Sequence, residues 1–232
     1  MGSALLWGAV AASSLVLGAL LGLARKWPDK WVGLVLAFGA GALVSSVSFE
    51  LAEEGLEVGS GLSVGIGLAV GAFTYWGLNR ELDRRSSGSA AGTALALGAF
   101  LDGIPEQLVL GIGIATGGGV SVALLVAIFV SNLPEAIGSS SQMRDAGRPP
   151  STIRRLWLAV AAVCLIATLA GYAIADNVSG EFQAAIDGFA AGALLVMLVD
   201  SMIPEAARKA GDTAGLVTTL GFAVAFGLSA VS

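Results

Sequence analysis

Histidine is absent from this chain of 232 residues, cysteine occurs once, and charged residues make up only 12%. Without histidine, the Ser–His–Asp and zinc–histidine arrangements of many hydrolases are excluded. The one cysteine, Cys164, allows no disulfide within the chain and gives no information on the redox compartment. A glycine-rich phosphate loop with a lysine is also missing, so we expect no bound nucleotide.

Apolar residues take the place of the missing charge, at 56% of the chain and a mean hydropathy of +0.84. Soluble domains carry about 25% charged residues, so this composition indicates an integral membrane protein. The apolar residues form runs and do not alternate, which favours helices over a β-barrel. Eight runs are long enough to cross a hydrocarbon core of about 30 Å. They cover residues 4–24, 31–52, 61–78, 90–115, 119–142, 155–175, 183–204 and 213–231. We therefore predict a single all-α transmembrane domain over residues 1–232 with eight membrane-spanning helices.

The twelve lysines and arginines fall into four clusters, which follow the first, third, fifth and seventh runs. They are Arg25, Lys26 and Lys30; Arg80, Arg84 and Arg85; Arg144, Arg148, Arg154 and Arg155; and Arg208 with Lys209. Loops rich in such residues face the cytoplasm, so we expect both termini outside the plasma membrane. Topological anchoring explains these clusters without a further role. The loop expected after the second run holds Glu53, Glu54 and Glu57 instead, as solvated acids that can also raise the local cation concentration.

Two segments of the chain resemble one another. Residues 37–43, Ala-Phe-Gly-Ala-Gly-Ala-Leu, align with residues 188–194, Gly-Phe-Ala-Ala-Gly-Ala-Leu, and the register continues without a gap to Glu54 and Glu205. These segments lie in the second and seventh runs, which cross the membrane in opposite directions. The pattern predicts an inverted repeat, spans one to three against six to eight, around a central pair of spans four and five. Small residues favour close packing, so spans two, four, five and seven should form the inner bundle.

Acids interrupt the two central runs. Residues 102–106 read Asp-Gly-Ile-Pro-Glu, and residues 131–135 read Ser-Asn-Leu-Pro-Glu. A carboxylate at the membrane centre costs roughly 2.5–3.5 kcal/mol on insertion scales, so an acid there indicates a functional site. On a helix Asp102 and Glu106 share one face, because they are four residues apart. Ser131 and Asn132 share a face with Glu135 in the same way.

Each acidic stretch also contains a proline that cannot donate a hydrogen bond. Pro105 and Pro134 therefore release the carbonyls of Leu101 and Val130 beside the carboxylates. Irregular backbone at this depth is tolerated where it is buried in protein or lines a wet cavity. Neighbouring carboxylates cannot all stay ionised without a partner, and no lysine or arginine is predicted at this depth.

A divalent metal is the natural counter-charge for these acids, and protons would compete with it for the same oxygens. The alternative is a packed kink in which the carboxyl groups are protonated and hydrogen-bonded. Asp200 is a further candidate ligand, four residues before Pro204 in the seventh run. It can face the same cavity, line the cytoplasmic exit, or be a simple interfacial acid.

These motifs resemble those of the ZIP family of divalent-metal transporters. That family has eight spans, both termini outside, an inverted repeat, and a His-Asn-x-Pro-Glu-Gly stretch in span four. Glu106 matches the glutamate of this stretch, whereas Asp102 stands at its histidine and Gly103 at its asparagine. In span five Asn132 and Glu135 match, and Ser131 replaces the first polar ligand. The resemblance implies that the transported ion is surrounded by Asp102, Glu106, Asn132 and Glu135.

The departures from the family pattern affect how many metal ions the site can hold and which metal its ligands prefer. Gly103 removes a ligand that helps to form a second metal position, and the sixth run contains no acid to complete one. Oxygen ligands suit Mn²⁺, Mg²⁺ or Fe²⁺ more than Zn²⁺, which favours nitrogen and sulfur. The resemblance nevertheless implies zinc or a similar transition metal.

The sequence therefore predicts a transporter that moves a divalent cation to the cytoplasm, with the metal as substrate and no prosthetic group. Its expected partners are the metal ion and the lipid bilayer, without nucleic acid, and a homodimer is left open. One alternative is a family member that binds or senses metal without transporting it. Another is an intramembrane enzyme that uses Asp102 and Glu135 as catalytic acids, although we expect no enzyme. Carrier and channel are not distinguished.

Overall fold

The computed structural model describes residues 1–85, 91–116, 120–175 and 179–230. The elements in chain order are α1 (Gly2–Ala24), α2 (Asp29–Ser46), the π-helical η1 (Val47–Ala52), α3 (Glu53–Val58), α4 (Gly61–Arg85), α5 (Ala91–Ala115), α6 (Val122–Asp145), α7 (Pro150–Ala175), α8 (Gly180–Met197), the π-helical η2 (Leu198–Met202), α9 (Ile203–Ala210), the 3-10 turn η3 (Gly211–Thr213) and α10 (Ala214–Ser229). No strand occurs within the described ranges, and the predicted all-α class is confirmed.

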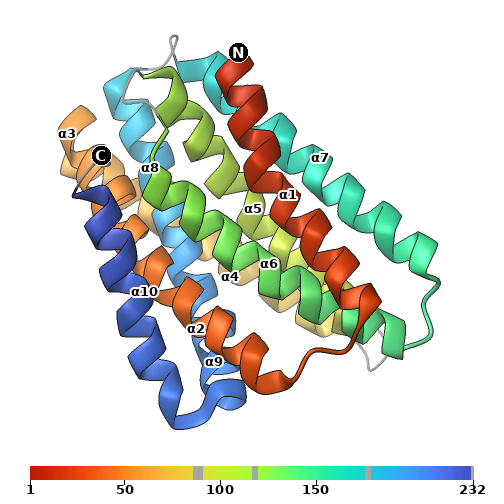
Figure 1. The fold of residues 1–232 in the computed structure, drawn as a ribbon. Coiled ribbons are helices and arrows are strands. Elements are labelled where there is room, and N and C mark those ends of the chain that lie inside the picture. Colours follow the sequence, from red (N-terminus) through yellow and green to blue (C-terminus); the bar gives the residue numbers. More distant parts are fainter. Residues whose placement is uncertain (86–90, 117–119, 176–178, 231–232) are drawn as a thin grey trace.

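Six helical stretches of the described residues are long and apolar enough to cross a membrane. One of them, Gly180–Ser229, reverses direction after α9, where Gly211 has a φ of 61° that glycine adopts without a Cβ clash (Figure 1). Within α5, the stretch Gly103–Ala115 is a shorter apolar helix. A multi-pass helical membrane protein is thus confirmed, whereas the count of eight spans stays a prediction.

The helix boundaries lie within a few residues of the predicted runs, except at the ends of the second, third and seventh runs, where the helices continue to Val58, Arg85 and Ala210. Glu53, Glu54 and Glu57 were expected in a loop, and this is wrong, because they lie in α3, which continues α2 through η1. Neither proline nor glycine occurs between Leu43 and Glu54, so no residue in this stretch ends the helix. It ends at Gly59, whose backbone is extended.

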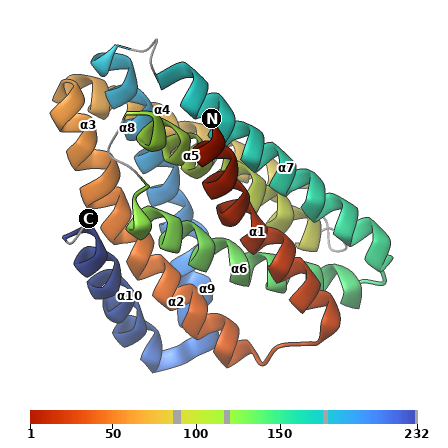
Figure 2. The same ribbon diagram turned by 45° about the horizontal axis from the view of Figure 1, so that its top comes forward.

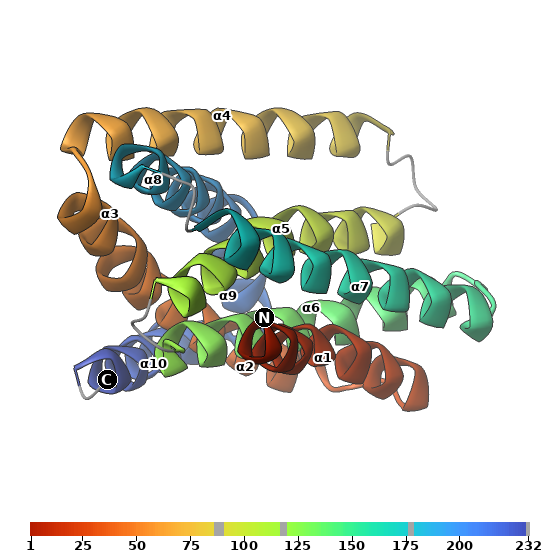
Figure 3. The same cartoon turned by 90° about the horizontal axis from the view of Figure 1, so that it is seen from above.

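The bundle has enclosed and peripheral helices. In Figures 1 and 2, α4 packs along α8 and α10 along α2, whereas α1 packs along α6 and α7 along α5. Figure 3 shows α4 at one side of the molecule. In the most apolar windows, 67% of the α2 stretch and 61% of the α6 stretch are buried, against 22% of α4. This burial agrees with the predicted inner bundle for the second and fifth runs.

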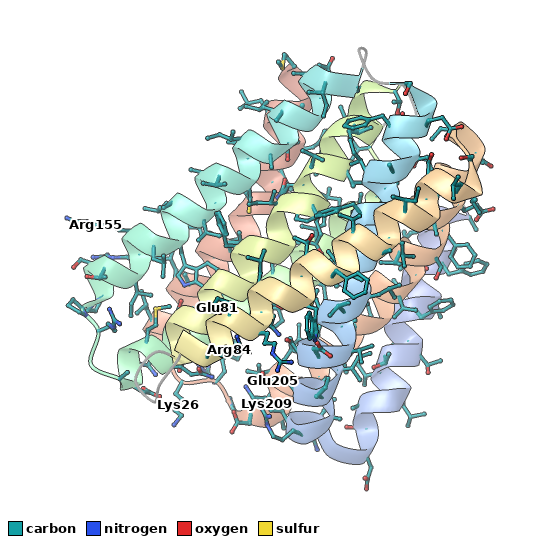
Figure 4. All side chains as sticks on the ribbon, turned by 180° about the vertical axis from the view of Figure 1, so that it is seen from behind. Lys26, Glu81, Arg84, Arg155, Glu205 and Lys209 are labelled. Carbon is teal, nitrogen blue, oxygen red and sulfur yellow. The ribbon has the colours of Figure 1, made fainter. Side chains whose placement is uncertain are left out.

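Basic residues gather at one end of the bundle. Figure 4 labels Lys26, Arg84, Arg155 and Lys209 toward this end, which we call the basic end. Figure 1 places the N- and C-termini at the opposite end. The four clusters of basic residues, separated in sequence, are therefore gathered by the fold as the alternation of runs predicts.

Small residues bring α1 and α6 together backbone to backbone. A Cβ at Gly18 would stand 2.5 Å from the carbonyl oxygen of Leu133, and one at Gly22 would stand 2.5 Å from that of Ile137. Small residues four apart allow such approach between membrane helices. Gly18 therefore lies against the turn of α6 that precedes Glu135, and α1 supports the backbone that carries this acid.

We predict that Gly18→Ala lowers the thermal midpoint of the purified protein in detergent. The new methyl group would force α1 and α6 apart, at a cost of about 1–3 kcal/mol. Gly65→Ala on α4 is the matched control, because nothing lies within 4 Å of a Cβ there. Equal midpoints for the two variants would contradict the contact between α1 and α6.

Candidate metal site

Glu106 of α5 is an almost fully buried carboxylate. Its side chain is 1% exposed, and neither oxygen has a hydrogen-bond partner among the described residues. The next residue, Gln107, accepts a hydrogen bond of 2.5 Å from Thr168 Oγ1, which fixes this turn of α5 against α7. Glu106 and Glu135 of α6 interact electrostatically. The carboxylates of these two predicted ligands, which come from different helices, therefore repel each other when both are ionised.

The polar stretch of α6 is also enclosed. Ser131 and Asn132 are 2% and 1% exposed. Ser131 Oγ donates a hydrogen bond of 3.1 Å to the carbonyl of Ile128, so its lone pairs remain available to a ligand. The amide nitrogen of Asn132 is buried and has no partner in the part of the chain that the structure describes. This turn of α6 thus supplies neutral polar groups one turn before Glu135.

A glycine on α2 lets two further elements close on this stretch. A Cβ at Gly39 would stand 3.3 Å from the carbonyl oxygen of Val130 and 2.8 Å from Met202 Cε of η2. The Val130 carbonyl is the one that loses its helical donor at Pro134. The released oxygen predicted from the sequence therefore lies against α2.

An open cavity of about 680 Å³ lies at the end of the bundle that carries the C-terminal residues of α10. Glu53, Glu54 and Glu57 of α3 line it together with the aromatic rings of Phe49 and Phe226. The acids of α3 thus line an open cavity, where their negative charge raises the local concentration of cations. We call it the acidic cavity.

A second, small cavity of about 40 Å³ lies beside Glu135. Its lining is formed by Val32, Leu36, Pro134, Glu135, Gly138, Ser201, Met202, Glu205 and Lys209. Lys209 lines the same cavity as Glu135, whereas the sequence predicted no lysine or arginine at the depth of these acids. The sequence interpretation ended the seventh span at Pro204, whereas α9 continues the helix and holds Lys209 within the protein.

Glu205 was not predicted as a site residue either. It lines the small cavity and interacts electrostatically with Glu135. A signal for it was present in the sequence, since Pro204 and Glu205 form a third Pro–Glu step like those of the fourth and fifth runs. Lys209 follows Glu205 at the four-residue spacing that pairs opposite charges on a helix.

The two remaining predicted ligands are Asp102 and Asp200. Asp102 lies in α5, but its side chain is outside the described residues. Asp200 is exposed on η2, next to Val199, whose side chain is 64% exposed. Within the described ranges, no three acidic or thiol side chains are grouped so that they could hold a metal ion. The full ligand set therefore stays a prediction.

Gly103 faces α7 at the single cysteine. A Cβ at residue 103 would stand 2.8 Å from Cys164 Sγ, and Cys164 is fully buried. A side chain at this position, such as the asparagine of the family pattern, would meet the thiol. Cys164 thus occupies the space beside Gly103.

The fold and these enclosed acids define a multi-pass helical membrane protein with a polar centre. The family model described as ZIP zinc transporter matches residues 79–230, which contain both Pro–Glu motifs of the central helices. The chain belongs to the ZIP family, and the predicted resemblance is confirmed. Membership of this family supports metal transport in general.

One similar protein is "Putative zinc transporter At3g08650" of Arabidopsis thaliana. It is 28% identical over 196 residues, which cover 79% of this chain and 31% of that protein. The chain thus spans about a third of the length of this curated relative.

We predict an energetic coupling between residues 103 and 164. Gly103→Ala should lower the thermal midpoint, because the new methyl group meets Cys164 Sγ, and Cys164→Ala in the same chain should restore most of the loss. The coupling free energy should be about 0.5–3 kcal/mol. Thermal unfolding of the four proteins of this double-mutant cycle measures it, and strictly additive losses would show that the two side chains do not touch.

Proposed function

We propose that this protein carries a divalent metal cation, zinc or a similar transition metal, across the plasma membrane toward the cytoplasm. The ion binds between α5 and α6, where Glu106, Asn132 and Glu135 hold it. Asp102 and Ser131 are further oxygen ligands. The observation that carries the proposal is the Glu106 carboxylate, 1% exposed and without a hydrogen-bond partner among the described residues.

A buried carboxylate in this state is costly. Taking such an ion out of water costs several kcal/mol even after relaxation, and each unmade hydrogen bond adds about 1–3 kcal/mol. Glu106 also lies in the field of Glu135, a group of like charge. A proton or a metal ion removes these penalties, so protons and metal compete for the same oxygens.

The identity of the ion follows from two kinds of evidence. Zinc is supported by the family and by the name of the Arabidopsis relative. The proposed ligands are oxygen and amide groups, with no histidine in the chain, and such ligands bind Mn²⁺ or Fe²⁺ as well. We therefore propose a site of broad selectivity that accepts zinc. It holds one ion, because Gly103 offers no side-chain ligand for a second ion.

The proposed architecture has eight spans in an inverted repeat, α1 to α4 against α7 to α10 around α5 and α6. The π-helical segments support it. They begin at Val47 and Leu198, which are matched by the same gap-free register that matches Phe38 with Phe189. A π-helical segment therefore begins at the corresponding residue in each half of the repeat.

Contacts between the halves support the repeat as well. A Cβ at Gly71 of α4 would meet the carbonyl of Phe189 on α8, and one at Gly221 of α10 would meet the carbonyl of Phe38 on α2. The two phenylalanines are matched in the repeat. The same close approach thus occurs twice, each time between one half and the other, as a two-fold axis in the membrane plane requires.

We propose that the basic end faces the cytoplasm and that the acidic cavity and both termini face outward. The positive-inside rule supports this orientation, and the basic residues labelled in Figure 4 gather at one end. A cation would then enter through the acidic cavity, bind at Glu106 and Glu135, and leave past Glu205. We propose no enzymatic activity, since ZIP proteins are transporters.

Replacement of either central acid tests the site. Glu106→Gln and Glu135→Gln should each lower Zn²⁺ uptake into proteoliposomes at least about tenfold, since each removes an anionic ligand. Glu81→Gln, an exposed acid at the end of α4, is the matched control and should retain uptake. Undiminished uptake by both variants would refute the site, and Zn²⁺ binding without uptake by the unmodified protein would favour a non-transporting homologue.

Labelling of single cysteines tests the orientation. In a Cys164→Ser background, Glu57→Cys should react with a membrane-impermeant maleimide added to intact cells. Lys26→Cys should react only after the cells are permeabilised. The reverse pattern would show that the basic end faces outward.

A further inference from the structure

Lys209 differs from Lys26 and Arg208 at the basic end, because its side chain is largely buried. Its Nζ lies 2.8 Å from Glu205 Oε1 and 3.8 Å from Asp29 Oδ1, and its side chain is only 15% exposed. The side chain of Lys26, whose Nζ lies 3.8 Å from Asp145 Oδ2, is 77% exposed. Arg208 lies 3.6 Å from the same Glu205 oxygen but is 70% exposed, so solvent screens its charge.

The backbone holds the base of the Lys209 side chain in place. A Cβ at Gly33 of α2 would stand 2.5 Å from Ala210 N and 2.6 Å from Lys209 Cβ. α9 is therefore packed directly on α2 at this residue. The ammonium stands at the end of a flexible four-carbon stem, which allows it to change partners.

The ammonium shares a cavity with two acids. Glu135 of α6, Glu205 and Lys209 of α9 line the cavity of about 40 Å³, which has room for a water molecule or a bare cation. Glu205 and Glu135 also interact electrostatically. Two carboxylates and one ammonium thus face a space that a single ion can fill.

We propose that Lys209 is a tethered counter-cation on the exit path, which holds Glu205 when no metal is present and yields this carboxylate to a metal ion that leaves Glu135. The proposal rests on the proposed transport function and assigns a positioning residue to its release step.

Competition between the ammonium of Lys209 and the departing metal ion explains how this lysine promotes release of the metal. Without the ammonium, Glu205 and Glu135 would form a doubly negative cavity that retains a dication. With it, the departing ion displaces the ammonium from Glu205, and the ammonium returns when the ion moves on. Lys209 therefore weakens the binding of metal at the exit and speeds its release, which is the requirement for turnover in a carrier.

Two single variants test this role, because it predicts opposite effects on Zn²⁺ affinity. Lys209→Met keeps the stem and removes the charge, so Zn²⁺ affinity should rise about tenfold while maximal uptake falls about tenfold. Glu205→Gln frees the ammonium to pair with Glu135, so Zn²⁺ affinity should fall. Isothermal titration of purified protein in detergent measures the affinity, and proteoliposomes measure uptake. A salt bridge that only stabilises the fold would shift both variants in the same direction.

The controls separate this proposal from the transport proposal. Lys26→Met removes an exposed charge at the same end and should leave Zn²⁺ affinity within about twofold of the unmodified protein. Unchanged affinity in Lys209→Met, or shifts of the same sign in both variants, would overturn the role of Lys209. If Lys209→Met does not fold, unchanged or tighter binding by Glu205→Gln overturns it. If the unmodified protein binds Zn²⁺ without uptake, the transport proposal fails, and the affinity shifts still decide the role of Lys209.

Discussion

The burial of the Glu106 carboxylate beside Glu135 is the constraint on which the rest of this structure depends. Bilayer and packed protein offer no water to solvate an anion, so the helices around it must supply a counter-charge or admit one. The polar groups of the chain are arranged accordingly. The acids of α3 surround an open cavity at one end, Glu106 and Glu135 lie within the bundle, and Glu205 follows toward the basic end with the ammonium of Lys209. We interpret this order of charges as one path for a cation.

Glycine makes the enclosure of these acids possible. The backbone of α6 at Leu133 is touched by Gly18 of α1, and its carbonyl at Val130 is approached by Gly39 of α2. Larger side chains at these positions would separate the helices and admit lipid or water to the carboxylates. The close packing of α1 and α2 against α6 is therefore what keeps lipid and water away from the carboxylates. A change that loosens α1 or α2 should alter the metal site even though it removes no ligand.

The features of the fold that depend on local sequence signals could be predicted from the sequence. Apolar runs predicted the all-helical class and most helix boundaries to within a few residues, and the Pro–Glu steps of the fourth and fifth runs led to the family. The errors arose where a helix continues past its apolar run. Glu53, Glu54 and Glu57 were placed in a loop, and Lys209 was counted as a topological anchor, because hydropathy alone ended both helices too early. The contact of Gly103 with Cys164 could not be predicted, since it depends on which faces of α5 and α7 meet.

An experimental structure with Zn²⁺ bound, in which anomalous scattering at the zinc edge locates the metal, tests the central claim most directly. The account predicts one ion inside the bundle, with an oxygen of Glu106 and an oxygen of Glu135 each about 2.0–2.2 Å from it. Zinc found only in the acidic cavity lined by Glu53, Glu54 and Glu57, with the two central carboxylates bound to other partners, would contradict it.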